Sequence, residues 1–139
     1  MDQGIWKLMQ KRLGYTDAEM EIFRSDPRNV KIMERAQDLL GKTIVFEVVE
    51  SHGCNIEHRK GDRFLFAAEG YMLAHKGPAK VCPYILPAMA RMMWVIQERI
   101  YEGLDPRPYF HGGHCEDVGI ECGGWGRVVF EASVVDRER

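Results

Sequence analysis

The sequence lacks any long uninterrupted apolar run and any excess of one charge. Its 19 basic and 21 acidic residues are interleaved along 139 positions and leave a net charge of −2, so no basic stripe is available to nucleic acid. Lysine and arginine interrupt the first 15 residues, which therefore have the pattern of neither a signal peptide nor a membrane span. We expect a cytoplasmic protein that binds neither nucleic acid nor a membrane.

Several motifs with known chemistry are also missing. No glycine-rich phosphate loop follows a predicted strand, no nucleophile elbow surrounds a serine, and no HExxH pair lies on a predicted helix. Phosphoryl transfer and serine hydrolysis are therefore unsupported. The remaining candidates for chemistry are the four cysteines and the histidines near them. In a reducing compartment such cysteines are metal ligands, reactive thiols or core residues more often than disulfides, although their even number leaves disulfides open.

The N-terminal part of the chain is predicted to be helical. Apolar residues recur at helical spacing from Ile5 to Leu13, and Thr16 with Glu19 has the form of a capping box that opens a second helix. A third helix is predicted over 26–40, with Asp26 as its N-cap, a proline at its first position and a glycine after its end. Its predicted inward residues are Val30, Met33, Ala36 and Leu40.

The rest of the chain alternates between strand and helix patterns. Period-two alternation predicts strands over 42–51, 62–68 and 126–135, and the stretch 82–103 is the longest helical candidate, with a regular start near Leu86 because of Pro87. Residues 69–81 lack a clear period, which indicates either a functional loop or a missed element. The predicted fold class is α+β: a small, mostly antiparallel sheet with one long packed helix and a helical N-terminal extension. We expect a single domain over 1–139, with the extension at 1–40 and the α+β core at 41–139.

Three short motifs follow one another in the predicted core. They are C-x3-H-x2-G-D, then C-P before the long helix, then C-x-D before the last strand, and their residues here are Cys54, His58, Gly61, Asp62, Cys82, Pro83, Cys115 and Asp117. In this order the motifs resemble a family of small, functionally uncharacterised bacterial and archaeal proteins, over roughly residues 43–135. The resemblance implies that these positions belong together, and it implies no particular activity. In that family a small residue, often glycine, precedes the histidine, where this chain has Glu57.

The first functional hypothesis is a metal-binding protein. Cys54, His58, Cys82 and Cys115 would converge on a zinc or iron ion, since a C-x3-H pair allows the backbone to turn and present both side chains to one point. A closed set of four ligands would be structural. A site with three of them bound would keep a position for water or a small-molecule substrate, as in a metal-dependent enzyme or an enzyme's accessory subunit.

Two other hypotheses stay open, and with them the question of whether the protein is an enzyme. In a metal-free thiol enzyme, Cys82 would be the nucleophile, His58 its base, and Cys54 or Cys115 a resolving partner. Cys82 could lie at the N-cap of the long helix, where the helix dipole lowers a thiol pKa, or in a turn before it. In an interaction module without catalysis, the N-terminal helices would dock a larger enzyme or a second copy of the chain.

Other residues near the motifs are interpreted as supporting ones. Asp62 is expected to satisfy N–H groups of a turn that enters a strand. Asp117 shares a strand face with Cys115 if the segment is extended, whereas Cys122 would point the other way. The glycines after Cys122 indicate a tight turn that lets backbone approach Trp125 or a ligand. His114, beside Cys115, could orient a site but is more simply a solvated loop residue.

Overall fold

The structure, a computed structural model, describes residues 3–138 and divides them into two compact units. The first ends at Gln37 and the second begins at Asp38, whereas the sequence placed the end of the helical extension at residue 40. Each unit has its own cluster of buried apolar side chains. That the chain forms one domain stays a prediction.

The N-terminal unit is built from short helices around a small aromatic cluster. Its first three helices are α1 (Gln3–Leu13), α2 (Asp17–Ser25) and α3 (Pro27–Glu34). Trp6, Met20 and Met33 are buried together, one from each helix. The edge of the Phe23 ring packs against Trp6, with centroids 6.0 Å apart. The predicted capping box of Thr16 and Glu19 is present, and so is the N-cap before Pro27.

The single helix predicted over 26–40 is wrong, because it breaks at Arg35 and continues as α4 (Ala36–Leu40). The break shifts the phase of the apolar positions, so that Leu39 is buried in the core of the second unit while the predicted inward residue Leu40 is exposed. Met33 belongs to the other cluster. The two short helices thus supply apolar residues to different clusters.

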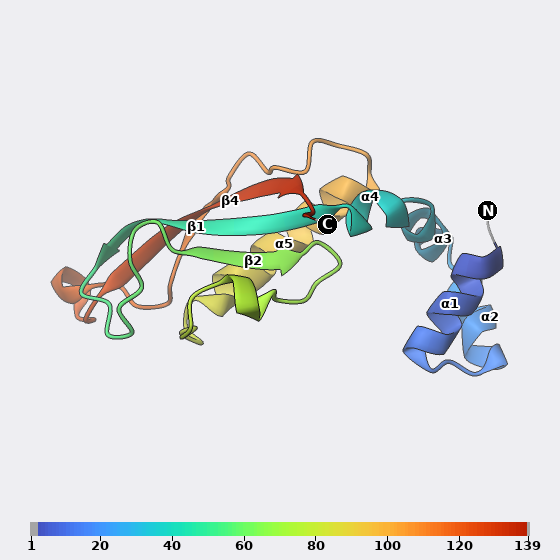
Figure 1. The fold of residues 1–139 in the computed structure, drawn as a ribbon, viewed down its shortest axis with the longest axis horizontal. Helices are drawn as coiled ribbons and strands as arrows, with labels where there is room; N and C mark the ends of the chain where they lie inside the picture. The colour runs from blue at the N-terminus through green and yellow to red at the C-terminus, as the bar shows by residue number, and fades with distance from the viewer. Residues whose placement is uncertain (1–2, 139) are drawn as a thin grey trace. The chain divides into compact units, whose positions relative to one another are not determined.

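The second unit contains a four-stranded antiparallel sheet in the order β2-β1-β4-β3. Figure 1 shows β2, β1 and β4 side by side. Its strands are β1 (Lys42–His52), β2 (Arg63–Ala67), β3 (Gly112–His114) and β4 (Arg127–Asp136). The alternation of the sequence fixes the register: Phe46 pairs with Phe64 on one side and with Ala132 on the other, so that large and small side chains meet on one face.

One face of this sheet is covered by the long helix α5 (Leu86–Tyr101), which starts at the predicted residue (Figure 1). Met89, Ile96 and Ile100 of the helix are buried in one cluster with Phe46 and Phe130 of the sheet. The predicted α+β class, with its antiparallel sheet and one long packed helix, is confirmed.

The stretch without a clear period, 69–81, contains elements that the sequence did not predict. Met72 forms an isolated bridge with Phe66, and the short 3-10 helix η1 (Ala74–Lys76) follows. A cavity on the other face of the sheet is lined by this segment together with Val45, which is 1% exposed. This explains why β1 is apolar on both sides near its middle. No helix among residues 3–138 is long and apolar enough to cross a membrane.

Candidate functional site

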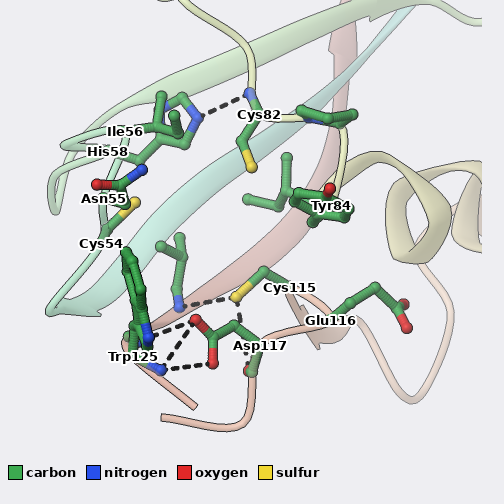
Figure 2. Close-up of a pocket in the computed structure, with 14 residues that line it drawn as sticks. Cys54, Asn55, Ile56, His58, Cys82, Tyr84, Cys115, Glu116, Asp117 and Trp125 are labelled. Atoms are coloured by element: carbon green, nitrogen blue, oxygen red, sulfur yellow. Dashed lines mark hydrogen bonds between the residues drawn. The ribbon is translucent and has the colours of Figure 1, made fainter. Parts of the chain in front are cut away.

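Three of the four cysteines line a single cavity of about 480 Å³ in the second unit. Cys54 comes from the connection between β1 and β2, Cys82 from the segment before α5, and Cys115 from the segment after β3. Figure 2 shows their sulfur atoms turned toward the space between these segments, with His58 beside Cys82. Three parts of the chain that are far apart in sequence therefore bring a free thiol to one place.

The connection between β1 and β2 is held by hydrogen bonds to its own backbone. The Ser51 hydroxyl donates to the carbonyl of His58, at 2.5 Å, and the Asp62 carboxylate accepts the N–H of Arg59, at 3.0 Å. The predicted role of Asp62 in a turn is thus confirmed. Gly61 donates its N–H to the carbonyl of Val48, at 2.8 Å, which returns the chain to the sheet.

Glu57 has a backbone conformation that favours glycine. Its φ is 68°, and it is the only non-glycine residue of the described chain, residues 3–138, with a positive φ. A side chain in this region costs free energy because the Cβ crowds the following carbonyl. A glycine would adopt this conformation without that cost.

His58 is 4% exposed, and both of its ring nitrogens face defined neighbours. Its Nε2 accepts the backbone N–H of Cys82 at 3.2 Å, and its Nδ1 lies 3.8 Å from the Asp62 carboxylate. Burial lowers the pKa of His58 below the usual histidine value, and the nearby Asp62 charge opposes that shift only in part. Because Nε2 accepts an N–H, it carries a lone pair and the ring proton lies on Nδ1; this hydrogen bond fixes the segment that carries Cys82.

Cys82 lies in a turn before the long helix and not at its N-cap. The N-cap is Ile85, whose N–H reaches the Cys82 carbonyl at 3.3 Å. Of the two placements that the sequence left open, the structure has the second, so the helix dipole is not directed at this thiol. The hydrogen bond from His58 goes to the Cys82 backbone, and among the described residues no hydrogen bond joins the ring to a sulfur atom.

Cys115 is the most buried of the three thiols, at 7% exposure. Its Sγ accepts the backbone N–H of Val128 at 3.4 Å and donates to the Asp117 carbonyl at 3.7 Å. Its backbone also pairs with Val128, since the Cys115 N–H donates to that residue's carbonyl. The thiol is thus held by backbone groups on two sides, an N–H that it accepts and a carbonyl to which it donates.

The Asp117 carboxylate organises the loop at the edge of the cavity and is already saturated with donors. It accepts backbone N–H groups of Gly119, Trp125 and Gly126 at 3.0 to 3.3 Å. These bonds, led by that of Gly126, lower the pKa of Asp117 below its usual value. Asp117 therefore shapes the wall that contains Trp125, whose indole lines the cavity near Cys54 (Figure 2).

Two glycines after Cys122 are required by close contacts, one with a side chain and one with backbone. A Cβ at Gly124 would lie 1.9 Å from an Asp117 carboxylate oxygen. A Cβ at Gly126 would lie 2.1 Å from the carbonyl oxygen of Gly53 and 2.7 Å from the backbone nitrogen of Cys54. The glycine-rich turn thus lets the start of β4 lie directly against the segment that carries Cys54, whereas the sequence predicted a backbone approach to Trp125 or a ligand.

Three of the predicted supporting residues do not line this cavity. Cys122 is exposed at the end of the 3-10 helix η2 (Ile120–Cys122). The Nδ1 of His114 donates to the Cys115 carbonyl at 2.6 Å, which holds the backbone beside the thiol. Asp62 contacts the cavity only through His58. Of the supporting set, Asp117 alone reaches the lining.

Sequence reasoning missed the aromatic and apolar walls of the cavity. Ile56, Tyr84 and Trp125 line it, although Tyr84 and Trp125 are 66% and 71% exposed. The one available signal was their position directly beside motif residues, since Tyr84 follows C-P and Trp125 lies in the glycine-rich turn. Within residues 3–138, no three His, Cys, Asp or Glu side chains are grouped closely enough to hold one metal ion.

Comparison with known proteins identified no relative of this chain. No family model, curated protein or solved structure matches the chain. The resemblance of the three motifs to a family stays a prediction, and the function is argued from the cavity.

Proposed function

We propose that this protein binds a metal centre, of zinc or iron, through the thiolates of Cys54, Cys82 and Cys115. The observation that carries the proposal is the meeting of three free thiols from distant segments at one cavity. A nucleophilic enzyme needs one such thiol, whereas a thiophilic metal uses several. The N–H that Val128 donates to the Cys115 sulfur supports the same chemistry, because hydrogen bonds of this kind orient and tune metal-bound thiolates.

His58 acts on this centre by positioning the Cys82 segment. A histidine binds a metal through a ring-nitrogen lone pair, and in His58 the Nε2 lone pair already accepts the Cys82 N–H. Ligation through Nε2 would require that bond to break and would leave the N–H without its partner. The carboxylate of Asp62 near Nδ1 keeps the ring in the tautomer that can accept.

The chemistry that a metal would supply is Lewis acidity or the activation of bound water, provided one coordination position stays open. The walls formed by Ile56, Tyr84 and Trp125 leave space beside the thiols for a small organic molecule. A small-molecule substrate is therefore part of the proposal. The competing function is a metal-free enzyme with Cys82 as nucleophile. It would need His58 to contact the Cys82 sulfur, whereas in the described chain the ring is hydrogen-bonded to the Cys82 backbone N–H.

The test is the metal content of single cysteine variants, purified without oxygen. Cys54→Ser, Cys82→Ser and Cys115→Ser should each lose most of the metal that the wild type carries, since each removes one ligand. Cys122→Ser is the matched control and should keep it, because Cys122 is exposed outside the cavity. His58→Gln should also keep most of the metal, as its amide oxygen can accept the Cys82 N–H.

Two results would contradict the proposal. One is a wild-type protein without metal in which Cys82 alone reacts rapidly with an alkylating agent, as the thiol enzyme requires. The other is equal metal loss in Cys122→Ser and in the three cavity variants. Complete loss in His58→Gln would instead show that this ring is a ligand and would refute its positioning role.

A further inference from the structure

The cavity has the dimensions of a site for something larger than one ion. Ligands of a single zinc ion lie about 2.0 to 2.3 Å from the metal, so their donor atoms crowd around one point. Within residues 3–138 no three suitable side chains are grouped in that way, although three thiols share a cavity of about 480 Å³. One ion could reach all three thiols only if the segments moved inward.

A polynuclear centre does not require its ligands to converge on one point. In an iron–sulfur cluster the cysteines bind different irons, so the thiolates surround the cluster at its corners and do not converge on one atom. We infer that the cavity holds a four-iron, four-sulfide cluster bound by Cys54, Cys82 and Cys115. This inference rests on the proposed function and narrows its metal to one class of centre.

Three cysteines leave one iron of such a cluster without a cysteine ligand. Cys122 is exposed outside the cavity, and the Nε2 of His58 accepts the Cys82 N–H. The fourth iron would therefore be open to a small molecule with an oxygen donor, on which it would act as a Lewis acid. Tyr84 and Trp125 give the cavity an aromatic lining that such a molecule would contact.

Assembly of the cluster core from two ferrous ions, two ferric ions and four sulfides balances in electrons, and the chain itself only loses three thiol protons to solvent. The backbone of Val128 already donates an N–H to the Cys115 sulfur, and this contact would remain as an N–H···S bond in the assembled centre. Hydrogen bonds of this kind are among the factors that set the reduction potential of a cluster.

The inference is tested by anaerobic reconstitution of the full chain with sulfide and equal amounts of ferrous and ferric iron, followed by desalting. The wild type and the Cys122→Ser control should each retain about four irons and about four acid-labile sulfides per chain, with the visible sulfide-to-iron absorption of a cluster. Cys54→Ser, Cys82→Ser and Cys115→Ser should retain less than about a quarter of both.

The outcomes separate this inference from the proposed function. A wild type that holds zinc or one iron through the same cysteines, with no acid-labile sulfide, overturns the cluster and leaves the metal site in place. Two irons and two sulfides per chain overturn the four-iron assignment. Iron and sulfide retained equally by the wild type and by Cys82→Ser are adventitious and overturn the inference. A chain that binds no metal at all overturns both.

Discussion

Replacing Gly126 by alanine tests the close contact that builds the wall of the cavity. The new Cβ would lie 2.1 Å from the carbonyl oxygen of Gly53 and 2.7 Å from the backbone nitrogen of Cys54. All of these atoms belong to backbone, so no flexible side chain can move away, and the two segments must separate by about 1 Å to reach ordinary contact. The N–H that Gly126 donates to Asp117 lies at the same point and would be strained.

The expected destabilisation is about 3 kcal/mol, at the upper end of the range for overpacked sites, because both partners are main chain. For a chain of this size that corresponds to a decrease in melting temperature of about 10 °C. Chelator-treated protein should be used, so that loss of metal does not contribute. Circular dichroism followed against temperature and urea gives both quantities.

The matched control is Gly112→Ala in β3. Its Cβ would meet only the Phe130 carbonyl oxygen, at 3.8 Å, and its φ is not positive, so a change within about 0.5 kcal/mol is expected. If the free energy of unfolding of Gly126→Ala lies within about 0.5 kcal/mol of the wild-type value, the start of β4 does not lie directly against the Cys54 segment.

Two further predictions concern the connection between β1 and β2. Because burial lowers the pKa of His58, the unfolded chain takes up a proton near pH 6.5 while the folded chain does so only at lower pH. The stability that neutral His58 allows is therefore complete above about pH 6.5 and is lost as the pH falls through the folded-state pKa. The measurement is the free energy of unfolding in urea, for metal-free protein at about pH 7.5 and about pH 5, and His58→Gln should reduce the difference between the two values. A difference as large in His58→Gln as in the wild type would refute the burial effect. Replacing Glu57, whose φ is 68°, by glycine should raise the free energy of unfolding by about 0.5 kcal/mol. The reason is that relief of about 1 kcal/mol of backbone strain exceeds the cost of the added entropy of the unfolded chain. A urea midpoint below that of the wild type would contradict this prediction.

Local sequence signals predicted most of the fold. The capping box at Thr16 and the alternation from Lys42 onward are properties of neighbouring residues, and both appear as expected. The strand β3 was not predictable in this way. Its residues are two glycines and a histidine, and its pairing depends on tertiary packing, since a Cβ at Gly113 would lie 2.6 Å from the Phe130 ring. The break at Arg35 was missed because it depends on two separate cores.

The sequence predicted which cysteines form the candidate site better than it predicted how they are arranged. The motif order grouped Cys54, Cys82 and Cys115, and all three line one cavity. The hydrogen bond between the His58 ring and the Cys82 backbone could not be foreseen, because it joins residues 24 positions apart through a buried side chain. Docking of a second copy or of a larger enzyme by the N-terminal helices stays a prediction, and the apolar residues Met20 and Met33 of those helices are buried in their own unit.

The central claim is that the cavity thiols hold a metal centre, and the most direct measurement counts the reactive cysteines of the native protein. Protein purified without oxygen is alkylated in the folded state and mapped by mass spectrometry, before and after the metal is released by chelator or mild acid. We predict that Cys122 alone is modified at first, and that the half-buried Cys54 and Cys82 become modified once metal is released. Rapid modification of Cys54 and Cys82 in the untreated protein, with no metal released, would contradict the account.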